Sequence, residues 1–171
     1  MNAPAKISQA PGSDCAAMLG HAERWRGQCI NSFAQLEVII EDLLKALQAG
    51  PKGSKIRTGE LVGPAFGHLR ELTGPKGPFA RTGSAVSATL EDLAGWFEWR
   101  AHLTHGVLTV WRGNGGNWLL VFAHRPAGNT SVRYHALPWK DAQELRSLLD
   151  EKIDMLQANA RSLAQSVLSK R

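Results

Sequence analysis

An arginine and two histidines stand close together in one short segment, "RAHLTHG", which runs from Arg100 to Gly106. An imidazole exchanges protons near neutral pH, and a guanidinium holds a phosphate through two parallel hydrogen bonds while charge develops on it. Together these two groups supply what metal-free cleavage of a phosphodiester requires. The segment therefore predicts a site for that chemistry, with Arg100 and His105 as its catalytic residues.

Helical periodicity decides whether these two side chains can meet. The apolar residues before the motif recur every three or four positions, which is typical of an amphipathic helix, and they are Val86, Leu90, Leu93 and Phe97. Arg100 is the next position of that stripe. On a continuous helix Arg100 and His105 would lie about 140° apart around the axis. We therefore expect one helix from about Ser84 to Thr104 that stops at Gly106, so that the imidazole can swing back toward the arginine.

An acidic residue interrupts the apolar stripe of an earlier expected helix, which spans about residues 14–49. Glu37 lies four residues after Phe33 and three before Ile40, so it occupies a core-facing position. An unpaired buried charge is very costly, which predicts that Glu37 contacts Arg100 across the two helices. On these residues alone, the pair could support catalysis or could merely fix the register of the two helices.

Basic residues concentrate between those two helices, in a region rich in Gly and Pro. The formal net charge of the chain is +5, and the segment 51–81 holds six basic residues against Glu60 and Glu71. The sequence "GPKGSKIRTG" at 50–59 is echoed by "GPKGPFARTG" at 74–83. We expect two basic turns on either side of a short helix at about 63–72. A polyanion would meet this segment first, through Lys52, Lys55, Arg57, Arg70, Lys76 and Arg81.

The pattern changes from helix to strand after the motif. Three strand-like runs, "VLTVW", "WLLVF" and "SVRYHAL", are separated by "RGNGGN" and "RPAGN", which are typical of hairpin turns with positive φ. Asp141 with Glu144 then predicts a capping box for a long closing helix. The expected fold class is mainly α, a helical bundle with a small antiparallel meander between the third and last helices. Residues 1–13 are expected to be disordered, and 14–171 to form one domain.

The remaining candidates are assigned no chemistry. His124 and His135 fall in expected strands, and six histidines without paired spacing predict neither a metal site nor a cofactor. Cys15 and Cys29 match no redox or zinc motif, so reduced thiols are expected. No signal peptide or membrane span is apparent, and we expect a soluble, cytoplasmic protein without membrane contacts. Core and dimer packing is favoured over base stacking for the tryptophans, namely Trp96, Trp99, Trp111, Trp118 and Trp139.

The motif and its surroundings resemble the HEPN superfamily. Its signature is an arginine followed four to six residues later by a histidine, often continuing into glycine, at the end of the third helix of a bundle. Arg100, His105 and Gly106 match that signature, and the resemblance covers about residues 20–168. It implies a homodimer that brings two motifs together and, in active members, a metal-independent endoribonuclease. Many members are toxins or defence effectors, which implies RNA as substrate and an antitoxin or regulatory protein as a further partner.

The chain departs from the family pattern immediately after the arginine. Family members usually carry a polar residue at the position that Ala101 occupies here. His102 could substitute for it as a supporting residue, although a solvated histidine on the helix surface is the favoured interpretation. Two hypotheses follow: a ribonuclease that cleaves single-stranded RNA, and a catalytically silent HEPN module that binds RNA or a protein. The dimer is expected to form through the motif helix, with Trp96 or Trp99 at the contact.

Overall fold

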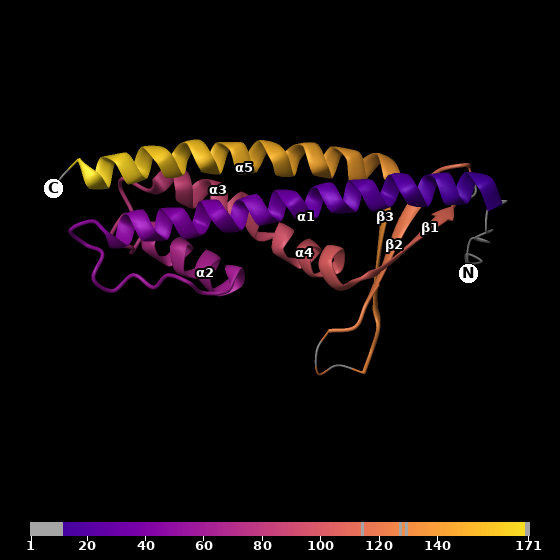
Figure 1. The fold of residues 1–171 in the computed structure, drawn as a ribbon, viewed down its shortest axis with the longest axis horizontal. Helices are drawn as coiled ribbons and strands as arrows, with labels where there is room; N and C mark the ends of the chain where they lie inside the picture. The colour runs from indigo at the N-terminus through magenta and orange to yellow at the C-terminus, as the bar shows by residue number, and fades with distance from the viewer. Residues whose placement is uncertain (1–11, 114, 127, 129, 170–171) are drawn as a thin grey trace. The chain divides into compact units, whose positions relative to one another are not determined.

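The computed structural model describes residues 12–113, 115–126, 128 and 130–169. Over these residues the chain is mainly helical with a small three-stranded sheet, as the sequence predicts (Figure 1). Of residues 1–13, which were expected to be disordered, residues 1–11 lie outside the described residues. The first helix begins at Gly12. In chain order the elements are α1 (Gly12–Gln48), α2 (Val62–Thr73), α3 (Ser84–Ala94), α4 (Trp96–His105), β1 (Val107–Arg112), β2 (Trp118–His124), β3 (Arg133–Pro138) and α5 (Trp139–Leu168).

The described chain divides into two compact units. The sheet unit consists of residues 12–31 and 98–148, and the helical unit consists of residues 32–97 and 149–169. The helices α1 and α4 each contribute residues to both units, and so does α5. The expectation of one domain from residue 14 onward stays a prediction.

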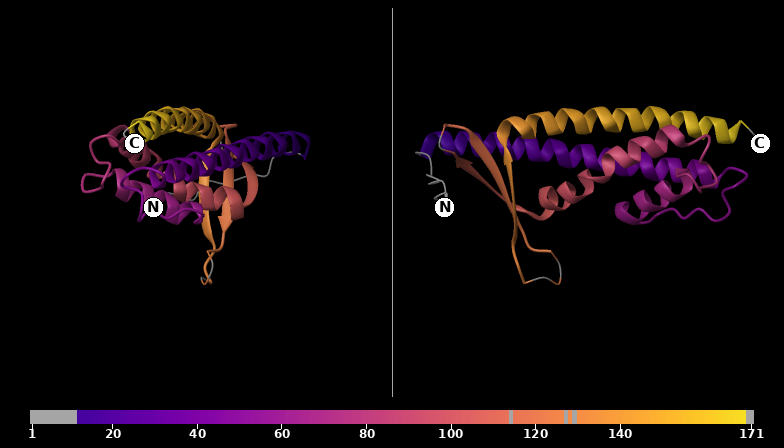
Figure 2. Two further views of the ribbon diagram at one scale, coloured as in Figure 1. Left: turned by 60° about the vertical axis from the view of Figure 1, so that its left-hand side comes forward. Right: turned by 180° about the vertical axis from the view of Figure 1, so that it is seen from behind.

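The helical unit is built on apolar stripes that the sequence spacing predicts. Leu36, Ile40 and Leu44 on α1 are almost completely buried, as are Leu149 and Leu156 on α5. Within this unit α5 runs beside α1 and α3 (Figures 1 and 2). Burying such side chains contributes about 1.5 to 3 kcal/mol each relative to exposure, so these stripes dominate the stability of the unit.

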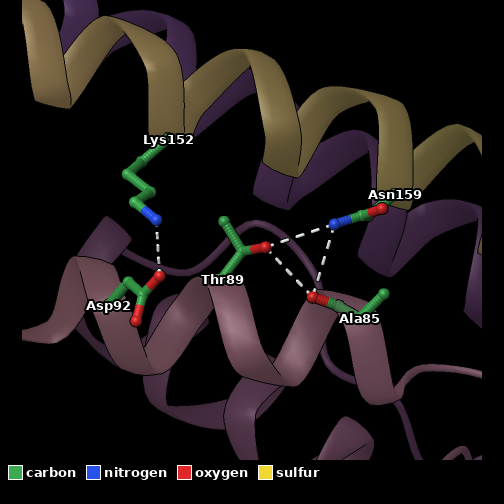
Figure 3. Close-up of polar contacts among 5 residues, drawn as sticks. All are labelled: Ala85, Thr89, Asp92, Lys152 and Asn159. Atoms are coloured by element: carbon green, nitrogen blue, oxygen red, sulfur yellow. Dashed lines mark hydrogen bonds and ion pairs between the residues drawn. The ribbon is translucent and has the colours of Figure 1, made fainter.

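Polar contacts fix how α5 lies along α3 (Figure 3). The Asn159 Nδ2 donates to the Thr89 hydroxyl at 3.2 Å, and the buried Thr89 hydroxyl in turn donates to the Ala85 carbonyl oxygen at 3.0 Å. One turn away from Thr89 along α3, the Lys152 Nζ lies 2.7 Å from the Asp92 Oδ2. That hydrogen bond raises the pKa of Lys152 above its usual 10.5, against a smaller opposing effect of burial. These pairs set the register that apolar contacts alone leave loosely defined.

The echoed sequence forms a structural repeat. After α1 the Gly53 N–H donates to the Gly50 carbonyl at 3.0 Å, and after α2 the Gly77 N–H donates to the Gly74 carbonyl at 2.9 Å. A Cβ added at Gly53 would lie 1.9 Å from a backbone oxygen of α1, and one added at Gly77 would lie 2.2 Å from a backbone oxygen of α2. Each copy therefore folds back onto the last turn of the helix before it, where no side chain fits. The short helix between the copies matches the predicted one within a residue at each end.

Two helix boundaries differ from the prediction. The helix expected from Ser84 to Thr104 is divided at Gly95 into α3 and α4, because glycine has poor helix propensity and no side chain to pack. The expected capping box at Asp141 is wrong, because α5 begins at Trp139, directly after β3 ends at Pro138. The carboxylate lies instead inside the first helical turn, where it faces the positive end of the helix dipole.

The sheet unit contains the predicted meander, in which β1 pairs with β2 and β2 with β3, all antiparallel. Gly116 and Gly128 in the connecting turns have φ angles of 80° and 75°, as the turn sequences predict. Phe122 is fully buried on one face of β2, and its ring lies 6.3 Å from that of Trp25 on α1. The Trp25 indole N–H donates to the Ala142 carbonyl oxygen of α5 at 2.7 Å. No helix in the described part of the chain combines the length and apolar character that crossing a bilayer requires.

Candidate active site

The motif helix α4 ends at His105, as the sequence predicts. The Gly106 N–H donates to the His102 carbonyl oxygen at 2.9 Å. A Cβ added at Gly106 would lie 2.4 Å from that same oxygen, so the backbone passes too close for any side chain. Gly106 is not among the described glycines with positive φ, so close approach and not a left-handed backbone is the reason for glycine here.

An arginine from α1 binds the end of the motif helix. The Arg26 Nε donates to the Leu103 carbonyl oxygen at 2.6 Å, and its Nη2 donates to the Thr104 carbonyl oxygen at 3.4 Å. The last carbonyls of a helix have no donors within the helix and carry its negative partial charge, so a guanidinium satisfies them well. Arg26 thus holds the turn that carries His105. Nothing in the sequence indicates this role, because a single arginine on a long helix is most often solvated.

Four of the six histidines of the chain form one cluster within the sheet unit. His102 and His105 come from α4, His124 from β2 and His135 from β3. The ring centroids of His102 and His135 are 5.1 Å apart, those of His102 and His124 5.5 Å, and those of His105 and His124 6.0 Å. His124 and His135 lie in strands, as the sequence predicts, but the sequence analysis did not anticipate that their rings lie beside those of the α4 histidines.

Strand geometry explains why the two strand histidines come together. His135 pairs directly with Phe122 across β2 and β3, and His124 lies two residues after Phe122, so all three share one face of the sheet. Phe122 is on the packed face, which directs both imidazoles toward α4. The cluster is hidden in the sequence because its members are far apart along the chain, and only the strand register brings them together.

His102 is part of the packed cluster. Its ring contacts those of Trp99, His124 and His135, and the residue is half-buried. The favoured interpretation of His102 as a solvated surface residue was therefore wrong. Trp99 also packs within the chain, since its ring lies 4.1 Å from that of His135 and 6.2 Å from that of Phe122. This confirms the expectation of core packing for Trp99.

Arg100 lies on α4 in the sheet unit and is half-buried, and its carbonyl oxygen accepts a hydrogen bond from the Thr104 hydroxyl at 2.8 Å. Glu37 is half-buried in the helical unit, where it lines a hollow of about 430 Å³ together with Glu41 and Glu60. Because Glu37 and Arg100 belong to different units, their pairing stays a prediction.

The basic segment lies in the helical unit and is only partly available to an anion. Arg57 pairs with Glu60 at 3.2 Å, and Arg70 forms two hydrogen bonds with the Glu91 carboxylate. Lys52 donates to a backbone carbonyl at 3.0 Å. The other three basic residues of the segment are exposed, and they are Lys55, Lys76 and Arg81.

Both copies of the echoed sequence contribute to one cavity of about 380 Å³. Pro51 and Lys52 line it from the first copy, and Phe79 and Arg81 line it from the second. Val167 of α5 completes the lining. Two cationic side chains at a cavity of this size favour an anionic group, in keeping with the charge of the segment.

The imidazole cluster can exchange protons, and a guanidinium such as that of Arg100, which is on the same helix as His102 and His105, can hold a phosphate. Among the described residues, no three or more histidine, cysteine or acidic side chains are arranged to hold a metal ion. In comparisons with known proteins, no family model matches the chain, and no curated protein or solved structure is significantly similar to it.

Proposed function

We propose that this protein is a metal-independent endoribonuclease of HEPN type that cleaves single-stranded RNA, with Arg100 and His105 at the scissile phosphate. The observation that carries the proposal is the arrangement of residues at the end of α4. It presents an exposed His105 one residue before Gly106, on the same helix as Arg100. Arg26 holds that end through two backbone carbonyls, which limits the positions that the imidazole can reach.

The chemistry needs only groups that this chain and its substrate supply. The RNA 2′-hydroxyl loses its proton and its oxygen attacks the adjacent phosphorus, while the bond to the 5′-oxygen breaks. The guanidinium of Arg100 holds the phosphate as negative charge develops on it, and His105 transfers a proton. The products are a 2′,3′-cyclic phosphate and a 5′-hydroxyl. DNA lacks the attacking hydroxyl and is spared.

The proposal includes three partners. RNA phosphates bind the basic segment chiefly through Lys55, Lys76 and Arg81, because the exposed Lys52 and Arg57 are engaged by a backbone carbonyl and by Glu60. Such phosphate contacts are independent of sequence. A second copy of the chain brings two motifs together, with Trp96 at the contact, because Trp99 is engaged within its own chain. An antitoxin or regulatory protein restrains the activity in the cytoplasm.

Incubation with single-stranded RNA in EDTA tests the activity. The wild-type protein is expected to leave 2′,3′-cyclic phosphate ends and to spare DNA of the same sequence. His105→Ala should lower the rate by roughly 10² to 10⁴, the usual range for a lost acid or base, with little change in RNA affinity. His21→Ala is the matched control, since His21 is exposed on α1 and contacts only Arg24 among the described hydrogen bonds. Cleavage that requires added magnesium, or equal rates for His105→Ala and wild type, would refute the proposal.

A catalytically silent module that binds RNA or protein is the second candidate. Ala101 favours it, because it removes a polar side chain from a position where active HEPN proteins usually have one. Under this alternative the protein retards RNA in a gel shift at low salt but leaves it intact over hours. The same shift should weaken when Lys55 and Lys76 are replaced by alanine.

A further inference from the structure

The histidine nearest to His105 comes from a different element. His124 is the last residue of β2, and its ring centroid lies 6.0 Å from that of His105, with only 26° between the ring planes. His105 is exposed and His124 is half-buried, so the pair lies where the packed cluster meets solvent. No apolar ring lies between the two in the described contacts.

We infer that His124 is the second proton-transfer group of the site, so that His105 and His124 act as an acid–base pair on the RNA phosphodiester. The inference rests on the proposed function. It goes further because the arginine and histidine of the motif provide only one group that can exchange protons near neutral pH.

Phosphodiester cleavage needs two proton transfers at opposite sides of phosphorus. One neutral imidazole accepts the proton of the 2′-hydroxyl as the new oxygen–phosphorus bond forms. The other imidazole, protonated, donates to the 5′-oxygen as its bond to phosphorus breaks. One proton enters and one leaves the pair, and exchange with water restores the starting state. Each ring nitrogen must come within about 3 Å of its oxygen, which two rings 6.0 Å apart permit around one phosphate.

The other two histidines of the cluster are less suited to this role. The His135 ring lies 4.1 Å from the Trp99 ring, and the His102 ring lies among Trp99, His124 and His135. The His102 residue is half-buried, whereas His135 is exposed although its ring packs against Trp99. Two cations also lie close to the pair, namely Arg26, which binds the end of α4, and Arg133, which lies directly opposite His124 across β2 and β3. These arginines and the two imidazoles contribute to the local charge.

A purely structural role for His124 makes a different prediction. If the ring only packs, His124→Phe should preserve the contacts and the activity, because phenylalanine keeps a planar ring of similar size. If His124 transfers a proton, the same change should remove activity while the fold is retained. His135→Phe is the matched control, since it makes the same replacement at a cluster position that does not contact His105 in the described ring pairs.

Rates of the full chain on an RNA oligonucleotide in EDTA, measured across pH, test the inference. His124→Phe should lower kcat by roughly 10² to 10⁴ with little change in KM or melting temperature, and should abolish one limb of a bell-shaped pH–rate profile. His105→Ala should abolish the other limb. His135→Phe should retain a bell-shaped profile and lose far less activity.

A substrate with sulfur in place of the 5′-oxygen assigns the two roles, because a thiolate leaves without protonation. The variant that has lost the acid should recover most of its rate on this substrate, and the variant that has lost the base should not. Recovery by both variants, or by neither, would overturn the acid–base pair.

The two proposals fail in different ways. If wild type cleaves RNA, His105→Ala does not, and His124→Phe cleaves as fast as wild type with the same pH profile, the pair is wrong and the ribonuclease stands. If wild type leaves RNA intact in every condition, the proposed function fails and the inference fails with it.

Discussion

Different kinds of side chain pack the interior of the helical unit and the interior of the sheet unit. In the helical unit, leucine and isoleucine stripes pack between helices, and ion pairs such as Lys152 with Asp92 lie at the edge. In the sheet unit, the space between α4 and the strands is filled largely by rings, among them Trp99, Phe122 and His102. The helical unit is packed mainly with aliphatic side chains, with His68 as a largely buried exception, whereas the sheet unit contains a cluster of several imidazoles.

This difference has a physical consequence for function. An aliphatic core contributes stability and nothing else, whereas every imidazole placed in a packed region brings ring nitrogens that require a hydrogen-bonding partner or water. Two of the four clustered histidines, His102 and His124, are half-buried, and this placement is costlier than filling the same space with aliphatic side chains. Such a choice favours chemistry over stability, and active sites are where proteins accept that cost.

The largest expected change in the free energy of unfolding comes from removing a buried side chain, and one such residue from each unit can be compared. Phe122→Ala should lower the free energy of unfolding by about 3 to 5 kcal/mol, because its ring is fully buried against Trp25 and Trp99. Leu156→Ala in the helical unit should cost about 2 to 5 kcal/mol. Urea denaturation measures both. A loss below about 1 kcal/mol for Phe122→Ala would mean that the ring cluster does not stabilise the sheet unit as a core does.

A smaller effect is expected where α1 binds the end of α4. Arg26→Met keeps most of the apolar stem but removes two charge-assisted hydrogen bonds to backbone carbonyls, so the free energy of unfolding should fall by about 1.5 to 3 kcal/mol. Arg24→Met is the control, because Arg24 is exposed and its described hydrogen bond goes to His21. Equal thermal stability of the two variants would show that Arg26 does not stabilise the position of α4.

Replacing glycine by alanine should have opposite effects on stability at the end of the motif helix and on the exposed face of α1. Gly106→Ala should destabilise the protein by about 1 to 3 kcal/mol, because its Cβ would collide with the His102 carbonyl oxygen. Gly27→Ala on α1 should instead stabilise it by about 0.4 to 1 kcal/mol, since a Cβ there meets nothing within 4 Å and alanine favours a helix. Chemical denaturation decides the sign of each change. Stabilisation by Gly106→Ala would show that the helix end can relax.

The smallest effect concerns the ion pair between α3 and α5. The pKa of Lys152 is raised in the folded state, so its contribution to stability is present below about pH 10.5 and is lost as the pH rises through the folded-state pKa. Unfolding free energies of wild type should therefore decrease more steeply than those of Lys152→Met between about pH 9 and 11. Lys140→Met, which removes an exposed lysine of the same helix, is the control. Parallel curves for wild type and Lys152→Met would contradict the linkage.

Most helices and strands, and most of their boundaries, could be predicted from local sequence patterns. Apolar residues at helical spacing predicted α1, α2 and α5, and alternation with turn glycines predicted the three strands and their order. Gly106 was correctly expected to end the motif helix. These features depend on residues a few positions apart along the chain, so they can be predicted from the sequence.

Contacts between side chains that are distant along the chain could not be predicted in the same way. The hydrogen bonds from Arg26 to the end of α4, and the proximity of His102 and His105 to His124 and His135, had no local signal. The last depends on strand register, and a shift of one residue would turn both strand histidines to the opposite face of the sheet. Spacing along the chain thus indicated Arg100 and His105 as candidates. The ring beside His105 is that of His124, and strand pairing places it there. Residues far apart in sequence become neighbours only once the sheet has formed.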